Sequence, residues 1–157
     1  DMGVPMAPFN AFLTNLGLET LPLRMERHSR NALAMAEFLE AHPEVSWVNY
    51  PGLASSPEHE MARKYLPDGA SGVLCFGVKG GKAAGERVMN SLRLAAIVVH
   101  VADVRTCVLH PASMTHRQLT DAELEAAGVS PDMIRLSVGI ENIDDLKADF
   151  DQALANA

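Results

Sequence analysis

The order of helix-like and strand-like segments constrains the fold of this chain more than any single motif does. Near its start, Ala32, Met35, Ala36 and Leu39 form an apolar stripe at helical spacing, and a second such stripe lies near the C-terminus. Between the two stripes lie short β-prone runs separated by turn residues. This order predicts an α/β fold, an α+β sandwich whose mostly antiparallel sheet is covered by helices on one side.

Local signals set the expected boundaries of these segments. Pro22 cannot continue a preceding helix, so one helix is expected to end near Thr20 and a longer one to run from Pro22 toward His42. Thr120 and Glu123 form a capping box that begins a later helix. The expected strands are 45–50, 71–79, 94–101, 106–109 and 133–138, with further helical segments within 53–70, at 84–92 and at 142–154.

Length, composition and charge exclude several classes of protein. The 157 residues, 48% hydrophobic and 21% charged, suit one soluble globular domain, 1–157. No run approaches the roughly 18 apolar residues of a membrane helix, so no membrane partner is expected. The net charge of −7, with 13 scattered basic residues, opposes nucleic-acid binding and favours a small neutral or zwitterionic ligand.

The start of the chain and its cysteines indicate a cytoplasmic protein. Residues 1–5 have no basic region followed by an apolar one, so they are not expected to be a secretory signal and read as a cut inside a longer chain. Cys75 and Cys107 lie in apolar strand-like runs and are expected to be buried thiols. His110 and His116 do not match a known zinc spacing, so no metal site is expected.

The most informative strand is the one around Arg135. Because side chains alternate along a strand, Ile134 and Leu136 share one face while Arg135 and Ser137 share the other. The apolar set belongs under the helices, so Arg135 is expected to project from the uncovered face. There a guanidinium can make two parallel hydrogen bonds to a carboxylate. An ion pair with Glu141 or another acid is the alternative, and the residues alone leave both open.

Several strings in the chain resemble the C-terminal region of the Cys/Met metabolism family of PLP-dependent enzymes. The match runs from about Pro8 to Leu154, and the strings occur in the family's order and spacing. "HPASMTH" followed by "GVSPDMIRLSVGIE" is most similar to the O-acetylhomoserine sulfhydrylase branch. The other strings are "LRMERHSRNALAMAEFLEAHPEV", "VNYPGL" and "DDLKADFDQAL".

The resemblance implies the small C-terminal domain of a fold type I PLP-dependent transferase, without the larger N-terminal PLP-binding domain. In that family the arginine of the "RLSVGIE" strand binds the substrate α-carboxylate, which assigns this role to Arg135. The loop before the "HPA" strand lies near the same carboxylate, which makes His100 a substrate-binding candidate. Thr115 corresponds to a family threonine close to the substrate, and Thr106 stands opposite a family serine in the loop.

The chain departs from the family pattern at residues 100–103. The family usually has Ser-Leu-Gly-Gly or Asn-Val-Gly-Asp there, and this chain has His100-Val101-Ala102-Asp103. Histidine is larger and can carry a charge. Alanine cannot adopt the positive φ of glycine without strain. The departure leaves open whether the full-length protein is a typical member of the family.

No lysine in the chain matches the cofactor lysine that the resemblance implies. A PLP enzyme needs a lysine to bind the cofactor covalently and to move protons at the substrate α-carbon. We therefore expect no catalytic and no cofactor-binding residue here, and neither bound PLP nor activity in this chain alone. The lysines, none of which has the Ser/Thr-flanked context of the family, are Lys64, Lys79, Lys82 and Lys147.

The resemblance implies the substrate-binding part of an O-acetylhomoserine sulfhydrylase-like enzyme. Its PLP-dependent γ-replacement makes homocysteine, a methionine precursor. The expected partners are a small amino-acid substrate, the missing N-terminal PLP domain and, in the full-length protein, further copies in a homo-oligomer. Two alternatives stay open: a stand-alone non-catalytic domain, and a member of the cystathionine γ-synthase or cystathionine lyase branch.

Overall fold

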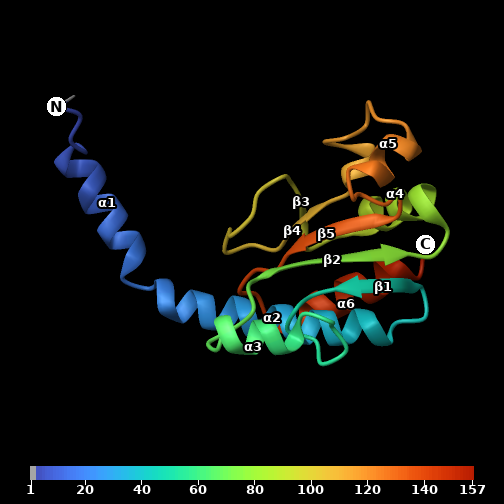
Figure 1. The fold of residues 1–157 in the computed structure, drawn as a ribbon, viewed down its shortest axis with the longest axis horizontal. Coiled ribbons are helices and arrows are strands. Elements are labelled where there is room, and N and C mark those ends of the chain that lie inside the picture. The colour runs from blue at the N-terminus through green and yellow to red at the C-terminus, as the bar shows by residue number, and fades with distance from the viewer. Residues whose placement is uncertain (1–2) are drawn as a thin grey trace.

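A five-stranded sheet organises the computed structural model, which describes residues 3–157 (Figure 1). Asp1 and Met2, part of the predicted non-signal start, lie outside the described residues. Across the sheet the strand order is β1-β2-β5-β4-β3, and every neighbouring pair is antiparallel except β3 with β4, which confirms the mostly antiparallel sheet. The strands are β1 (Val45–Asn49), β2 (Val73–Val78), β3 (Ala96–Ile97), β4 (Cys107–Leu109) and β5 (Met133–Ser137).

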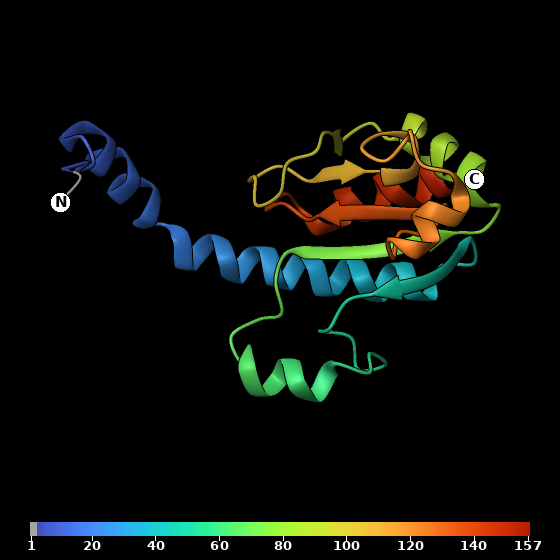
Figure 2. The same cartoon turned by 45° about the horizontal axis from the view of Figure 1, so that its top comes forward.

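Helices cover one face of this sheet, as predicted (Figures 1 and 2). The helices of the chain are α1 (Pro8–Leu18), α2 (Leu21–Ala41), α3 (His59–Tyr65), α4 (Gly81–Ser91), α5 (Asp121–Ala126) and α6 (Ile143–Leu154), with a 3-10 turn η1 (Pro111–Ser113). Helices α2 and α4 pack on the sheet, and α6 contacts both of them. Within residues 3–157 no helix is long and apolar enough to cross a membrane.

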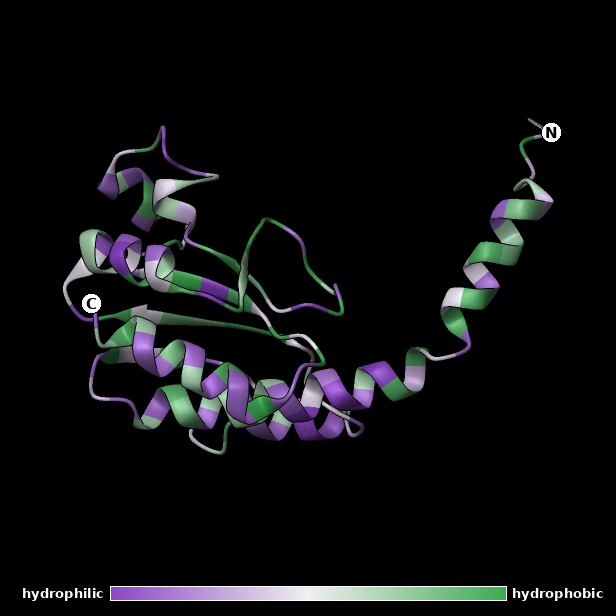
Figure 3. Cartoon of the chain, turned by 180° about the vertical axis from the view of Figure 1, so that it is seen from behind, coloured by the Kyte–Doolittle hydropathy of each residue, from purple (hydrophilic) through white to green (hydrophobic). Residues whose placement is uncertain are grey.

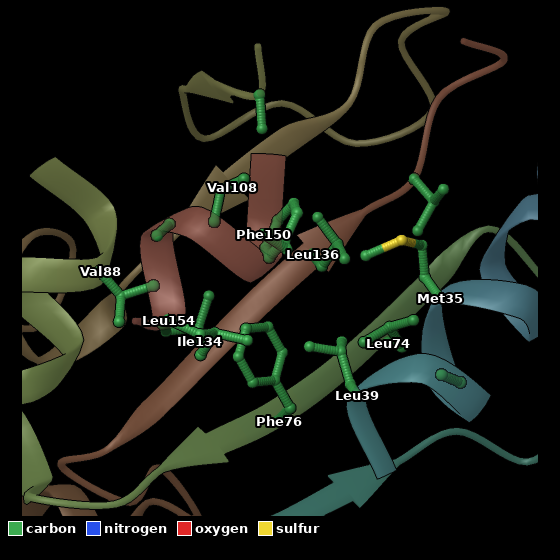
Figure 4. Close-up of a cluster of buried hydrophobic side chains, with 14 of the residues drawn as sticks. Met35, Leu39, Leu74, Phe76, Val88, Val108, Ile134, Leu136, Phe150 and Leu154 are labelled. Carbon is green, nitrogen blue, oxygen red and sulfur yellow. The ribbon is translucent and has the colours of Figure 1, made fainter. Parts of the chain in front are cut away.

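The hydrophobic core lies between the central strands and these helices (Figure 4). Phe76 of β2 and Phe150 of α6 meet edge to face, with ring centroids 6.2 Å apart. Ile134 and Leu136 of β5 are fully buried on the same side, as is Leu39 of α2. Burying each such side chain contributes roughly 1.5–3 kcal/mol to stability. The pairing of β2 with β5 under the helices is therefore the centre of the fold.

Helix starts fall where the capping signals predict. Pro22 lies in the first turn of α2, where the N–H that it lacks has no helical partner in any case. Thr120 and Glu123 form both hydrogen bonds of the predicted capping box at the start of α5. At the start of α6, Asn142 Oδ1 accepts a hydrogen bond from the Asp144 N–H at 2.8 Å. These local signals are sufficient because each acts within one helical turn.

The strand predicted for residues 94–101 is wrong over most of its length. Only Ala96–Ile97 form β3. The Asp149 carboxylate, which α6 brings in from the other end of the chain, accepts hydrogen bonds of 2.8–3.0 Å from the backbone N–H groups of residues 93–95. Those residues turn around the carboxylate, and the chain leaves the sheet after Ile97. The local β-propensity contains no information about this distant acceptor.

The two cysteines differ in burial, so the prediction of two buried thiols is only half correct. Cys107 in β4 is buried, whereas Cys75 in β2 is half-buried because its side chain lies on the sheet face that the helices leave open. Desolvation by burial raises the pKa of both thiols, and the nearby Arg135 guanidinium opposes this rise. Both are free thiols.

Helix α1 stands apart from the core (Figures 1 and 2). None of its residues is buried, and its apolar residues, coloured green along the ribbon in Figure 3, are exposed. The helix contains no charged residue. An uncharged helix with this much exposed apolar surface is typical of a segment that packs against another protein part. The exposed apolar residues of α1 are Phe9, Phe12, Leu13, Leu16 and Leu18.

Replacing Asp149 with alanine is expected to lower the free energy of unfolding by about 3 kcal/mol, because three backbone N–H groups lose a buried, charged acceptor. Urea unfolding followed by circular dichroism measures the change. The matched control is Asp151→Ala, whose exposed carboxylate makes only a 3.5 Å contact with His42, and it should cost less than about 1 kcal/mol. Equal losses in the two variants would contradict the role of Asp149.

Candidate substrate-carboxylate site

Arg135 projects from the open face of the sheet, as strand alternation predicts. Ile134 and Leu136, its neighbours in β5, are fully buried on the helix side, while Arg135 is partly exposed. Its cross-strand partners are Cys75 of β2 and Leu109 of β4. Arg135 therefore stands in the middle of the sheet, on the face opposite α2, α4 and α6.

The 98–106 loop, which joins β3 to β4, crosses this open face (Figure 1). Parallel strands cannot be joined by a hairpin, so their connection must leave the sheet and return over one of its faces. Two hydrogen bonds place the loop above β5. Arg135 Nη2 donates to the Val99 carbonyl at 2.9 Å, and the Ala102 N–H donates to Ser137 Oγ at 3.1 Å.

The structure contains no ion pair between Arg135 and Glu141, nor between Arg135 and any other acid of residues 3–157. Glu141 uses its carboxylate on Thr106, accepting the backbone N–H at 2.5 Å and the hydroxyl at 2.9 Å. Arg135 has five N–H donors, and its one hydrogen bond goes to a neutral carbonyl. The charge of the guanidinium and its remaining N–H donors are thus available to an anionic partner.

Helix α2 braces the backbone that follows Arg135. His28 Nδ1 donates to the Val138 carbonyl at 2.6 Å, and Asn31 Nδ2 donates to the carbonyls of Gly139 and Glu141, both at 3.0 Å. We assign the proton to His28 Nδ1 because a carbonyl can only accept. Both side chains are buried, so water does not compete with them for these carbonyls. The end of β5 is therefore fixed from the helix side.

His100 lies on the exposed part of the 98–106 loop, next to the Val99 carbonyl that binds Arg135. No hydrogen bond within the described chain holds its imidazole. Nearby, Asp103 pairs with Arg105 at 3.2 Å. Hydrogen bonds from Arg105 lower the pKa of the Asp103 carboxyl, and the charge of His100 contributes in the same direction. His100 thus follows directly after the residue whose carbonyl binds the Arg135 guanidinium.

Ala102 has a φ of +61°, in the left-handed region that favours glycine. Its N–H must point at Ser137 to close the hydrogen bond that holds the loop on β5. This is the position where the resemblance leads us to expect glycine. The strain anticipated from the sequence is therefore present, and the loop keeps its path in spite of it.

Thr115 lies in a different segment from the 98–106 loop. It is exposed after η1, and its hydroxyl pairs with the His116 imidazole at 2.9 Å. In the part of the chain that the structure describes, no hydrogen bond joins it to Arg135 or His100. Thr106, by contrast, is buried at the base of the loop. The structure thus joins Arg135, His100 and Thr106 through one loop and leaves Thr115 apart.

His110 is a buried structural histidine. Its Nε2 donates to the Pro131 carbonyl at 3.0 Å, and its Nδ1 accepts from the Ser113 hydroxyl at 2.8 Å. Desolvation by burial lowers the pKa of the imidazole, which favours its neutral form. Over residues 3–157 there is no group of three or more His, Cys, Asp or Glu side chains placed to hold a metal ion.

The lysines of the chain lie away from Arg135 and do not fit a covalent PLP site beside it. Lys82 and Lys147 belong to α4 and α6, the helices on the opposite side of the sheet. Lys64 is in α3, and the Lys79 ammonium donates to the Pro43 carbonyl at the end of β2. The residues present can position a substrate carboxylate, but they supply no cofactor lysine.

Comparison with known proteins identifies the family. A model described as "Cys/Met metabolism PLP-dependent enzyme" matches residues 1–155. The chain belongs to this Cys/Met metabolism family. It is 54% identical to homocysteine synthase of Schizosaccharomyces pombe and 49% identical to O-acetyl-L-homoserine sulfhydrylase 1 of Thermus thermophilus. The matches cover 98% and 99% of this chain, but only 36% and 37% of those relatives.

A solved structure of the Cys/Met family supports the fold. A crystal structure assigned as an O-acetylhomoserine (thiol)-lyase from Campylobacter jejuni, with a pyridoxyl-lysine phosphate group, matches with a TM-score of 0.87 at 44% identity. The match covers 99% of this chain and 37% of that one. The predicted family and fold class are confirmed, and the chain spans little more than a third of the length of these relatives.

Sequence reasoning missed most of the residues that fix the loop of this Cys/Met family chain. From the sequence, Glu141 is only a possible ion-pair partner of Arg135, and Ser137 only shares its strand face. His28 and Asn31 went unnoticed, although they continue the apolar stripe of α2 at helical spacing before Ala32. Polar residues in line with an apolar stripe are buried and need partners, which is the signal that could have found them.

The change Ala102→Gly is expected to stabilise the protein by about 1 kcal/mol, because it relieves a left-handed backbone conformation at an exposed position. Urea unfolding measures the free energy change. The control, Ala148→Gly, is the same substitution in the middle of α6 and should destabilise by roughly 0.5–1 kcal/mol. If both variants lose stability equally, Ala102 is not strained.

Proposed function

We propose that this chain is the C-terminal, substrate-binding domain of an O-acetylhomoserine sulfhydrylase-like enzyme. One observation carries the proposal: Arg135 stands on the open sheet face with its charge unpaired within residues 3–157, beneath a loop that takes only one of its hydrogen bonds. In the full-length protein, a sulfur nucleophile would replace the acetate group at Cγ of O-acetylhomoserine and yield homocysteine. The names and identities of the relatives support this substrate class.

Arg135 is proposed to bind the α-carboxylate of the amino acid. Two parallel N–H donors of a guanidinium match the two oxygens of a carboxylate, a geometry that a lysine cannot supply. The Val99 carbonyl restrains one side of the group and so limits its rotation. Holding the carboxylate fixes the direction of the substrate chain, which accelerates a reaction by orientation.

We propose that PLP is the cofactor and that it is held by a part of the full-length protein outside residues 1–157. PLP acts as an electron sink for carbanion chemistry at amino acids. None of the four lysines described above lies on the open face, so the covalent site must come from elsewhere. Residues 1–157 are therefore proposed to be inactive on their own.

The apolar surface of α1 is proposed to pack against this cofactor domain. The helix is uncharged, it has no buried residue, and it stands away from the core (Figure 2). The relatives extend well beyond the matched third of their length, which provides a partner of adequate size. We further propose that the full-length protein is a homo-oligomer. We also propose that it is cytoplasmic, since both cysteines are free thiols.

His100 and Thr115 are proposed as additional substrate contacts. His100 adjoins the carbonyl that orients Arg135, so its imidazole can reach a ligand held there. Thr115 belongs to a separate exposed segment, so it would meet another part of the substrate than the carboxylate.

In the full-length enzyme, Arg135→Lys is expected to raise KM for O-acetylhomoserine roughly 10- to 100-fold, because one charge-assisted hydrogen bond is lost. Steady-state kinetics measure KM and kcat separately. The matched control is Arg93→Lys, a change at an exposed arginine ahead of β3, which should leave KM unchanged. An unchanged KM in Arg135→Lys would refute the carboxylate role.

Residues 1–157 expressed alone should form no homocysteine and show no absorbance of lysine-bound PLP, because this stretch has no lysine beside Arg135. Absorbance titration with PLP and a thiol assay test both statements. The full-length protein is the control and should be yellow and active. Activity in residues 1–157 would contradict the proposed division of the site, and a colourless, inactive full-length protein would contradict the enzyme assignment.

A further inference from the structure

Glu141 holds the base of the 98–106 loop with both oxygens of its carboxylate. Oε1 accepts the Thr106 N–H at 2.5 Å, and Oε2 accepts the Thr106 hydroxyl at 2.9 Å. An ionised carboxylate has only acceptors, and here each oxygen meets one donor. Hydrogen bonds to an ionised acceptor are also stronger than those between neutral groups. Both carboxylate oxygens are therefore bound to the base of this loop.

Thr106 also binds the segment that follows β5. Its hydroxyl donates to Glu141 and also accepts the Gly139 N–H at 2.9 Å. Thr106 is only 1% exposed, so water cannot replace either partner. A side chain at Gly139 would overlap the Glu141 carboxylate and the Val104 carbonyl, and only glycine leaves room for these contacts. One buried hydroxyl thus joins the loop to the strand end.

The rest of the loop is attached to β5 and to the segment that follows it. The Ile140 N–H donates to the Val104 carbonyl at 2.9 Å. Further along, Ser137 holds the backbone of the loop, and Val99 at its far end accepts the hydrogen bond from Arg135. The loop is therefore anchored at intervals from its base at Glu141 to the carbonyl that restrains the guanidinium.

We propose that Glu141 is a positioning residue for Arg135. By fixing the 98–106 loop, it holds the Val99 carbonyl where this acceptor directs the guanidinium toward the substrate carboxylate. Because Glu141 is committed to Thr106, it also leaves the charge of Arg135 available for the substrate. The inference rests on the carboxylate role proposed above for Arg135 and adds the group that maintains it.

The test compares two competitive inhibitors of the full-length enzyme, L-norleucine and its carboxamide, which differ only in the carboxylate. The inhibition constant of the carboxamide divided by that of L-norleucine measures carboxylate recognition. A general loss of folded protein does not change this ratio. Glu141→Gln is expected to lower this ratio about fivefold, because one oxygen that accepts a hydrogen bond becomes a donor. When Arg135→Lys is already present, Glu141→Gln should lower the ratio by less than about a further twofold, because both changes act through the guanidinium of Arg135.

Independent, multiplicative effects of the two changes would overturn the inference, as would an unchanged ratio in Glu141→Gln. If Arg135→Lys itself leaves the ratio unchanged, the carboxylate role fails as well, which separates the two claims. Should Glu141→Gln not fold, Thr106→Val interrupts the same link and must lower the ratio. The control is Glu123→Gln, the same chemical change in the capping box of α5, which should keep the ratio of the unmodified enzyme.

Discussion

Burial of one face of the central strands under α2, α4 and α6 is the constraint on which the rest of the structure depends. Ile134 and Leu136 must lie against the helices, and the alternation of a strand then forces Arg135 to the opposite face. A shift of one residue in register would expose the apolar pair and bury the charge, at a cost of several kcal/mol. The position of the candidate site is therefore a consequence of core formation.

The parallel pairing of β3 with β4 adds the second component of the site. A loop that joins parallel neighbours must cross a face of the sheet, and the helix-covered face has no room for it. Once the loop lies on the open face, its polar backbone groups need partners, and the segment from Arg135 to Glu141 provides them. One short stretch of sequence thus both presents a guanidinium and fastens the loop that limits its rotation.

The arrangement supplies the groups that recognise a carboxylate without those that a covalent cofactor needs. Recognition of a carboxylate needs charge, donors and a fixed direction, and β5 with its loop provides all three. Covalent chemistry at the α-carbon needs a lysine close to the substrate, and the lysines described lie on the helices or at strand ends away from Arg135. The proposed second domain would supply this lysine and cover the exposed apolar surface of α1.

The order of segments along the sequence predicted the mostly antiparallel sheet. Local chemistry let the sequence by itself determine the helix caps at Thr120 and Asn142 and the face on which Arg135 lies. Each of these depends on residues within a few positions of one another, or on strand alternation. Only the tertiary structure decided that residues 93–95 turn around Asp149, that the 98–106 loop crosses above β5, and that Glu141 binds Thr106 in place of Arg135. These contacts join residues more than 30 positions apart, and no local pattern of propensity or charge specifies which of several possible partners a polar group will meet.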